Sequence, residues 1–125
     1  MPKKILVVDD SMSTREHIIA YCQKLNDDCI FVQAHDGEDG YRALVENKKN
    51  IDLIISDQNM PRMTGLEFLK KIKEEEQFKK IPFVIATSST DKSLILEALN
   101  LGASDFITKP FEEELLLKKL ERLLI

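Results

Sequence analysis

Acidic, hydroxyl and basic side chains follow short apolar runs in this sequence. Carboxylates held close together repel one another and retain protons unless a cation neutralises them. Mg²⁺ takes oxygen ligands, often only one or two of them carboxylates, and leaves positions for water and phosphate. A fold that gathered these side chains could therefore hold Mg²⁺ beside a phosphoryl group. The set is Asp9 and Asp10 after residues 5–8, Asp57 after residues 51–55, Thr87 and Ser88 after residues 83–86, and Lys109 after residues 106–107.

The apolar runs alternate with longer segments in which apolar residues recur at helical spacing. Three of the runs are apolar almost without a break, which indicates strands buried on both faces. The predicted strands cover residues 5–8, 29–32, 51–55, 83–86 and 106–107. The predicted helices cover residues 13–25, 36–47, 65–75, 91–101 and 112–124.

Two of the helix starts carry capping signals. Residues 13–16 read Ser-Thr-Arg-Glu, the spacing of a capping box, which predicts the start of the first helix. Asp91 is the predicted cap of the fourth helix. In that helix the spacing places Ile95, Ala98 and Leu99 toward the core.

The order of the elements predicts the fold. Strands joined through helices must run parallel, and their crossovers are almost always right-handed. The sequence therefore predicts an α/β fold, a doubly wound (βα)5 flavodoxin-like sandwich with a parallel five-stranded sheet of order 2-1-3-4-5. We expect one domain over residues 1–125. The carboxyl ends of its strands share one edge of the sheet, which would bring the polar set together.

The composition argues against several classes of function. Of the 125 residues, 43% are hydrophobic and 32% are charged, as in ordinary globular domains. A formal net charge of -4 and a pI near 5.2 provide no basic surface for nucleic acid. No segment approaches the ~20 apolar residues of a membrane span, so we expect no membrane partner. The apolar run at residues 5–8 is too short for the apolar region of a signal peptide, so we expect a cytoplasmic location. Cys22 and Cys29 have no CxxC spacing and are interpreted as small buried hydrophobic residues.

Four short motifs lie at the ends of predicted strands: VVDD at residues 7–10, IISDQNMPRMTG at 54–65, IATSS at 85–89 and TKPF at 108–111. In combination they resemble the receiver domain of two-component response regulators, of the single-domain chemotaxis-regulator type, over essentially the whole chain. The resemblance implies a signalling switch that accepts a phosphoryl group on Asp57 from a sensor histidine kinase, a phosphotransfer protein or a small phosphodonor.

The resemblance also implies a Mg²⁺ site beside the acceptor. Asp10 and Asp57 would bind the ion together with the backbone carbonyl of Asn59, and Asp9 would act mainly through waters. Pro61 would stiffen the loop that carries Asn59.

Further residues receive roles from the resemblance. Lys109 would pair with the phosphoryl oxygens, and Thr87 would donate a hydrogen bond to one of them. Thr87 and Phe106 would form the switch, and Asn59 and Ser89 would tune the rate of dephosphorylation.

The resemblance also implies two features of the backbone, and the sequence departs from the family pattern at two positions. Gly65 would permit a tight turn into the third helix, and the peptide Lys109–Pro110 would be cis. Ser88 stands where the family often has alanine. Phe106 has no hydroxyl at the aromatic switch position, so it can be buried without a hydrogen-bond partner.

The expected output surface is the face formed by the fourth helix, the fifth strand and the fifth helix. Leu94 and Leu115 lie outside the main core stripes of their helices and could contact a downstream protein target there. Scattered exposed leucines are also common on ordinary surfaces, so both interpretations stay open.

Two other functions compete with the signalling switch, for which we expect no separate substrate turnover. A Mg²⁺-dependent phosphohydrolase acting through an aspartyl phosphate would place its nucleophile in a DxDx pattern after the first strand, where this chain has Asp9, Asp10 and Ser11. A nucleotide- or flavin-binding module would have a Gly-rich turn there, and the stretch DDSMS has no glycine. Taken alone, Asp57 could also be an ordinary turn or capping aspartate.

Overall fold

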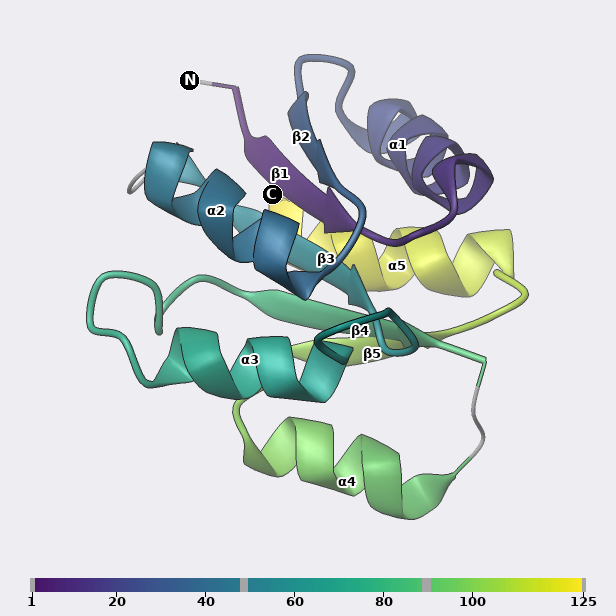
Figure 1. Ribbon diagram of the computed structural model, residues 1–125. Coiled ribbons are helices and arrows are strands. Elements are labelled where there is room, and N and C mark those ends of the chain that lie inside the picture. The colour runs from purple at the N-terminus through teal and green to yellow at the C-terminus, as the bar shows by residue number, and fades with distance from the viewer. Residues whose placement is uncertain (1, 48–49, 89–90, 125) are drawn as a thin grey trace.

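The computed structural model describes residues 2–47, 50–88 and 91–124 of the chain. Strands and helices alternate along these residues, as the sequence predicts (Figure 1). The strands are β1 (Lys4–Val8), β2 (Ile30–Ala34), β3 (Leu53–Asp57), β4 (Phe83–Thr87) and β5 (Asp105–Thr108). The helices are α1 (Met12–Leu25), α2 (Gly37–Asn47), α3 (Gly65–Lys73), α4 (Lys92–Asn100) and α5 (Glu113–Leu124). Within these ranges no helix is long and apolar enough to cross a membrane.

The sheet has the predicted order β2-β1-β3-β4-β5, and every neighbouring pair is parallel. The ends of adjacent strands are in register, with Asp57 opposite Ala86 and Thr87 opposite Thr108. All strands therefore finish on the same side of the molecule, as the arrowheads in Figure 1 show. This arrangement confirms the doubly wound fold.

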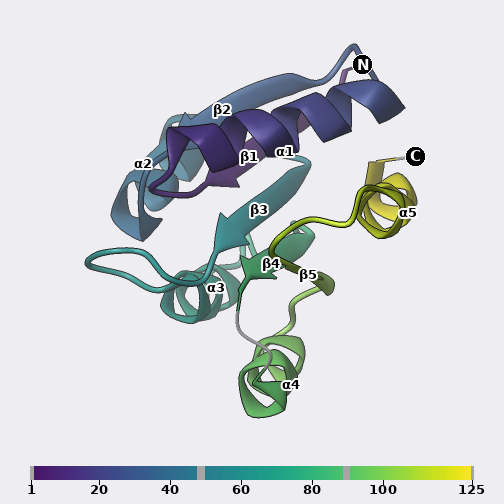
Figure 2. The same cartoon turned by 90° about the vertical axis from the view of Figure 1, so that its right-hand side faces the viewer.

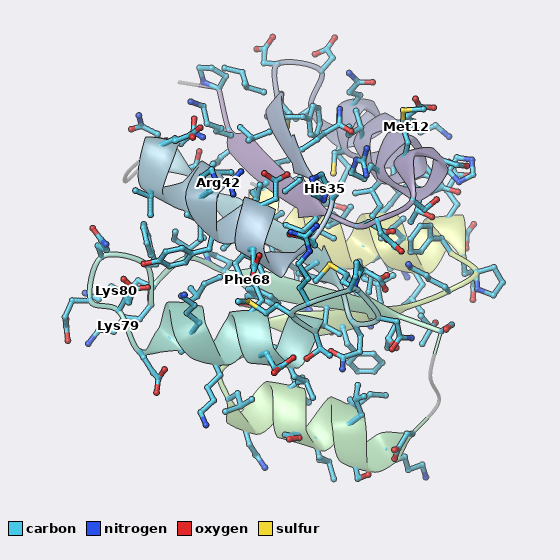
Figure 3. The ribbon with its side chains drawn as sticks, in the orientation of Figure 1. Met12, His35, Arg42, Phe68, Lys79 and Lys80 are labelled. Carbon is cyan, nitrogen blue, oxygen red and sulfur yellow. The ribbon has the colours of Figure 1, made fainter. Side chains whose placement is uncertain are left out.

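Helices cover both faces of the sheet and form two cores, with α2, α3 and α4 on one face and α1 and α5 on the other (Figure 2). Successive strand residues point to opposite faces, so Val8 contributes to the first core and Val7 to the second. In the first core Phe68 of α3 is fully buried, and its ring centroid lies 5.7 Å from that of Phe83 (Figure 3). All residues of β3 and β4 are buried, which confirms the interpretation of their continuous apolarity.

The third strand extends further than its apolar run. The apolar run covers residues 51–55, and the prediction that Asp57 terminates the strand is confirmed, because the ladder continues through Ser56 to Asp57. Backbone pairing with β1 and β4 does not depend on the side chain, so polar residues can complete a strand that apolar residues begin. Asp57 therefore belongs to the rigid sheet and not to the loop that follows.

The first helix begins earlier than the predicted capping box. Ser11 is the N-cap of α1, and its Oγ accepts the N–H of Thr14 at 3.3 Å. The box at residues 13–16 is therefore wrong, because Ser13 already lies inside the helix. Asp9 determines this start, since its Oδ1 accepts the N–H of Ser11 at 2.9 Å.

One inward residue of the fourth helix is predicted wrongly. Asp91 caps α4 and accepts the N–H of Ser93 at 2.9 Å, as predicted. Ala98 is fully buried and Ile95 is half-buried, but Leu99 is 41% exposed. The core contacts α4 along a narrow stripe around Ala98, which leaves Leu99 outside it.

Gly65 brings the start of α3 against the backbone of Asp57. Thr64 is the N-cap of α3 and forms a capping box with Glu67. The N–H of Gly65 donates to the carbonyl of Gln58 at 3.0 Å. A Cβ atom on Gly65 would collide with the backbone oxygen of Asp57. The tight turn expected at Gly65 is confirmed, and its physical reason is this close approach.

We expect Gly65→Ala to destabilise the protein more than the neighbouring Thr64→Ala. Loss of the Thr64 cap should lower the free energy of unfolding by about 1 kcal/mol. The methyl group added at residue 65 must displace the backbone of Asp57, which should lower it by about 3 kcal/mol. Urea unfolding measures both values, and equal midpoints for the two variants would contradict the proposed close approach.

Candidate functional site

The strand ends gather the predicted polar set at one edge of the sheet. Asp9 and Asp10 follow β1, Asp57 ends β3, and one carboxylate oxygen of each lies within 4.8 Å of the other two. The Nζ atom of Lys109, which follows β5, lies 2.9 Å from Asp9 Oδ2 and 3.1 Å from Asp57 Oδ1. Thr87, the last residue of β4, is fully buried. The predicted convergence is therefore confirmed for these residues.

Burial and neighbouring charges change the pKa values of Asp57 and Lys109. The Asp57 residue is only 7% exposed. Burial, and after it the negative charge of Asp9, raise the pKa of Asp57, although Lys109 opposes the change. Burial disfavours the ammonium form of Lys109, but the hydrogen bond to Asp9 and the charge of Asp57 outweigh it, so the pKa of Lys109 is raised. Lys109 therefore remains protonated between two carboxylates.

The site has three carboxylates and one ammonium group, which contacts two of them, so negative charge exceeds positive charge. Asp10 is exposed to solvent. Oxygen ligands at this spacing fit a hard divalent cation that keeps part of its water shell. The raised pKa of Asp57 agrees, since a cation would relieve the repulsion that contributes to it. Among the described residues, this is the one group of three or more acidic, histidine or cysteine side chains with the spacing of a metal site.

Gln58 is a buried site residue that sequence reasoning missed. Its N–H donates to Asp57 Oδ1 at 2.8 Å, which holds the carboxylate in place. Its side-chain Oε1 accepts the N–H of Leu66 at 2.9 Å, in the first turn of α3. Gln58 thus joins the Asp57 carboxylate to the following helix. Its position directly after Asp57 was the only signal in the sequence.

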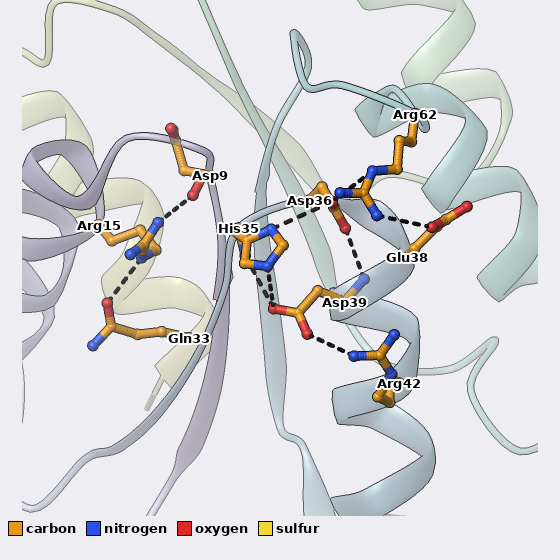
Figure 4. Close-up of polar contacts among 9 residues, drawn as sticks. All are labelled: Asp9, Arg15, Gln33, His35, Asp36, Glu38, Asp39, Arg42 and Arg62. Carbon is orange, nitrogen blue, oxygen red and sulfur yellow. Dashed lines mark hydrogen bonds and ion pairs between the residues drawn. The ribbon is translucent and has the colours of Figure 1, made fainter.

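Arg15 is a second missed residue, and it supports the other central aspartate. Its Nη1 donates to the backbone carbonyl of Asp9 at 2.5 Å (Figure 4). Its Nε donates to Gln33 Oε1 of β2 at 2.9 Å. The guanidinium group therefore joins α1 and β2 to the end of β1. Neither helical nor strand periodicity in the sequence indicates this contact.

The other predicted site residues differ in their exposure to solvent. Asn59 and Ser88 are exposed, and Ser89 lies outside the described residues. The peptide Lys109–Pro110 is cis, as the resemblance implies.

Phe106 of β5 is half-buried and is held against α5. The Nζ atom of Lys119 lies 4.1 Å from the centroid of the Phe106 ring and donates to the Phe106 carbonyl at 2.6 Å. Asp105 lies 3.4 Å from Lys119 Nζ and 2.6 Å from Arg122 Nη2. These contacts couple the predicted switch residue to α5.

The comparison with protein families agrees with the fold and the site. The family model for the response regulator receiver domain matches residues 5–121. The chain belongs to the response regulator receiver domain family.

Within that family, the chain is similar to chemotaxis proteins named CheY. It is 35% identical over 121 residues to the chemotaxis protein CheY homolog of Campylobacter jejuni, covering 97% of this chain and 92% of the relative. It is 36% identical over 121 residues to CheY-3 of Vibrio cholerae, covering 96% of this chain and 90% of the relative. The solved structure of CheY4 of Vibrio cholerae superposes with a TM-score of 0.86 at 35% identity, covering 99% of this chain and 100% of that chain.

We expect Asp57→Asn to melt at a higher temperature than the wild type at pH 7 without divalent cations. Because the folded-state pKa of Asp57 is raised, the folded protein binds a proton there more tightly than the unfolded chain does. The stability contributed by this group is present in acid and is lost as the pH rises past the unfolded and then the folded pKa. The difference between the proteins should therefore shrink as the pH is lowered.

Scanning calorimetry over a series of pH values measures this difference. A rise of about 4 °C would correspond to about 1 kcal/mol for a domain of this size. Asp27→Asn, at an exposed position, controls for the general loss of a negative charge. A melting temperature of Asp57→Asn below that of the wild type at pH 7 would contradict the expected repulsion.

Proposed function

We propose that this chain is a phosphorylation-dependent signalling switch and that Asp57 accepts the phosphoryl group. The observation that carries the proposal is the contact of Lys109 with both Asp57 and Asp9 at the strand ends. An ammonium group in this place can neutralise a phosphoryl group on Asp57. Membership of the receiver family and similarity to chemotaxis regulators support the same function.

Asp57 would act as the nucleophile. One of its carboxylate oxygens attacks the phosphorus of a phosphohistidine on a sensor histidine kinase or a phosphotransfer protein. The P–O bond forms as the P–N bond breaks, the imidazole leaves, and Asp57 carries an acyl phosphate. Lys109 would then pair with the phosphoryl oxygens, and the Thr87 hydroxyl would donate a hydrogen bond to one of them. Positioning and charge neutralisation provide most of the catalysis in such transfers.

Asp10, Asp57 and the backbone carbonyl of Asn59 are the proposed Mg²⁺ ligands. When bound, Mg²⁺ supplies positive charge that stabilises the phosphoryl oxygens. Asp9 already accepts a hydrogen bond from Lys109 at 2.9 Å, which supports its proposed indirect role through water. Asn59 and Ser89 are proposed to tune the hydrolysis of the acyl phosphate, and the exposure of Asn59 allows it to border the path of the attacking water.

The proposed output surface is the α4-β5-α5 face, which would control a protein partner. Leu115 is 45% exposed on α5 and Leu94 is half-buried on α4. Leu96 and Leu99 add further exposed apolar surface on α4. We propose one receiver domain over residues 1–125 that acts in the cytoplasm, with no direct contact to nucleic acid or membrane.

We expect acetyl phosphate with Mg²⁺ to add one phosphoryl group to the wild-type protein. Lys109 contacts both Asp9 and Asp57, but both carboxylate oxygens of Asp9 already accept hydrogen bonds, from Ser11 and from Lys109. We therefore expect the label on Asp57, where it should be labile to hydroxylamine and absent from Asp57→Asn. Chelation of Mg²⁺ with EDTA should abolish labelling, and Asp10→Ala should weaken Mg²⁺ binding sharply.

Intact-mass spectrometry detects the label. Labelling of Asp57→Asn at the wild-type rate and extent would overturn the assignment of the acceptor. Continuous turnover of a free phosphomonoester would instead favour the phosphohydrolase.

We expect Thr87→Ala to accept the phosphoryl group but to lose most of the response at residues 91–120. Movement of the Thr87 hydroxyl toward the phosphoryl group would vacate space that Phe106 can fill, and a coupling of about 1–3 kcal/mol is typical of such switches. Amide chemical shifts with and without beryllofluoride, an acyl-phosphate mimic, measure the response in both proteins. Wild-type shifts in the variant across α4 and β5 would show that Thr87 and Phe106 are not the switch.

A further inference from the structure

A second polar cluster lies where the start of α2 meets the loop between β3 and α3 (Figure 4). Asp36, in the turn before α2, is 1% exposed. Its Oδ1 accepts the N–H of Asp39 at 2.8 Å and so caps α2. Its Oδ2 has no hydrogen-bond partner among the described residues, but it lies 3.3 Å from His35 Nδ1 and 3.7 Å from Arg62 Nε. A buried carboxylate therefore faces a cation on the β3–α3 loop.

Arg62 has an unusual backbone conformation in this loop. Its φ of 68° lies in the left-handed region, which glycine enters more readily than other residues. Across it, the N–H of Met63 donates to the carbonyl of Pro61 at 2.7 Å. This is the hydrogen-bond pattern of a γ-turn with positive φ, which is rare and strained. Such a turn persists only where surrounding contacts hold it.

The first turn of α2 supplies those contacts. Beside the pair with Asp36, Nη1 of Arg62 lies 3.5 Å from Glu38 Oε2. Met63 occupies the space that a side chain on Gly37 would need, because a Cβ atom there would lie 2.8 Å from Met63 Sδ. Ion pairs of Arg62 and close packing of Met63 thus hold the β3–α3 loop against the first turn of α2.

We propose that Asp36 and Arg62 are positioning residues that hold the β3–α3 loop and thereby place the carbonyl of Asn59 for Mg²⁺. Asn59 lies on this loop, three residues before Arg62. The inference rests on the proposed function, in which that carbonyl binds the ion. A loop already held in its bound conformation does not have to be ordered when the ion arrives, so its affinity is higher.

The charge of Arg62 and its proposed role in holding the loop predict opposite changes in Mg²⁺ affinity when its side chain is removed. Removing a cation near an acidic site should strengthen Mg²⁺ binding by electrostatics alone, whereas loss of the anchor should weaken it. Arg62→Gly separates the two effects, since glycine adopts the left-handed conformation without strain. Asp36→Asn removes the buried charge but keeps the cap of α2, because Asn caps helices as well as Asp does.

Calorimetric titration with Mg²⁺ should show about tenfold weaker binding for Arg62→Gly and for Asp36→Asn. Substitutions of residues that orient the ligands of a metal ion typically weaken its binding by at least this factor. The double variant should bind no more weakly than Arg62→Gly, because Arg62→Gly already removes the pair with Asp36 together with the pair with Glu38. Arg42→Gln is the matched control, since Arg42 pairs with Asp39 on α2, 3.5 Å away, and should bind as the wild type does. Wild-type or tighter binding by Arg62→Gly overturns the proposal.

Amide hydrogen exchange without Mg²⁺ tests the loop separately from the proposed function. In Asp36→Asn, whose loop sequence is intact, the amide of Met63 should exchange faster while that of Ile55 in β3 remains protected. Unchanged exchange at Met63 overturns the proposal. If the wild-type protein binds no Mg²⁺, the proposed function fails, and the exchange result alone decides whether Asp36 and Arg62 hold the loop.

Discussion

The repulsion among three carboxylates at one edge of the sheet is the constraint on which the rest of the structure depends. Asp9, Asp10 and Asp57 have oxygens within 4.8 Å of one another, and Lys109 compensates only part of their charge. A parallel sheet makes this site possible, because Asp9 and Lys109 meet although they are 100 residues apart. Buried apolar cores on both faces supply the stability that such a site lacks, as expected where function opposes local stability.

The sequence was most informative where a single physical rule decides the structure. Continuous apolarity and alternation determine the strands and their parallel order, and the strand ends then place Asp57 and Lys109 together. The same rules fail where two residues satisfy them equally. Ser11 and Ser13 could both cap α1, and only the bond from the N–H of Ser11 to Asp9 selects the first. Leu99 fits a helical stripe, but the width of the contact between α4 and the core excludes it.

Contacts between loops could not be predicted, because they depend on backbone conformations that no residue pattern specifies. Gln58 donates its N–H to the adjacent Asp57 carboxylate, and its side chain reaches α3 through the N–H of Leu66, which requires the close approach of the helix at Gly65. The pair between Asp36 and Arg62 likewise requires a positive φ at an arginine, which propensities argue against. Both sets lie beside the site, where local rules and the requirements of function are expected to disagree.

The surroundings of Asp57 differ on its two sides, and this difference gives the proposed signal a direction. Toward α3, the carbonyl of Gln58 accepts the N–H of Gly65 at 3.0 Å, and the backbone at Gly65 packs closely against the backbone of Asp57. Toward α4, Thr87 ends its strand and is followed by the exposed Ser88. A phosphoryl group on Asp57 would thus lie between closely packed backbone on the α3 side and the buried Thr87 side chain on the α4 side. The α3 side would position the acceptor, and the change would pass to the α4-β5-α5 face.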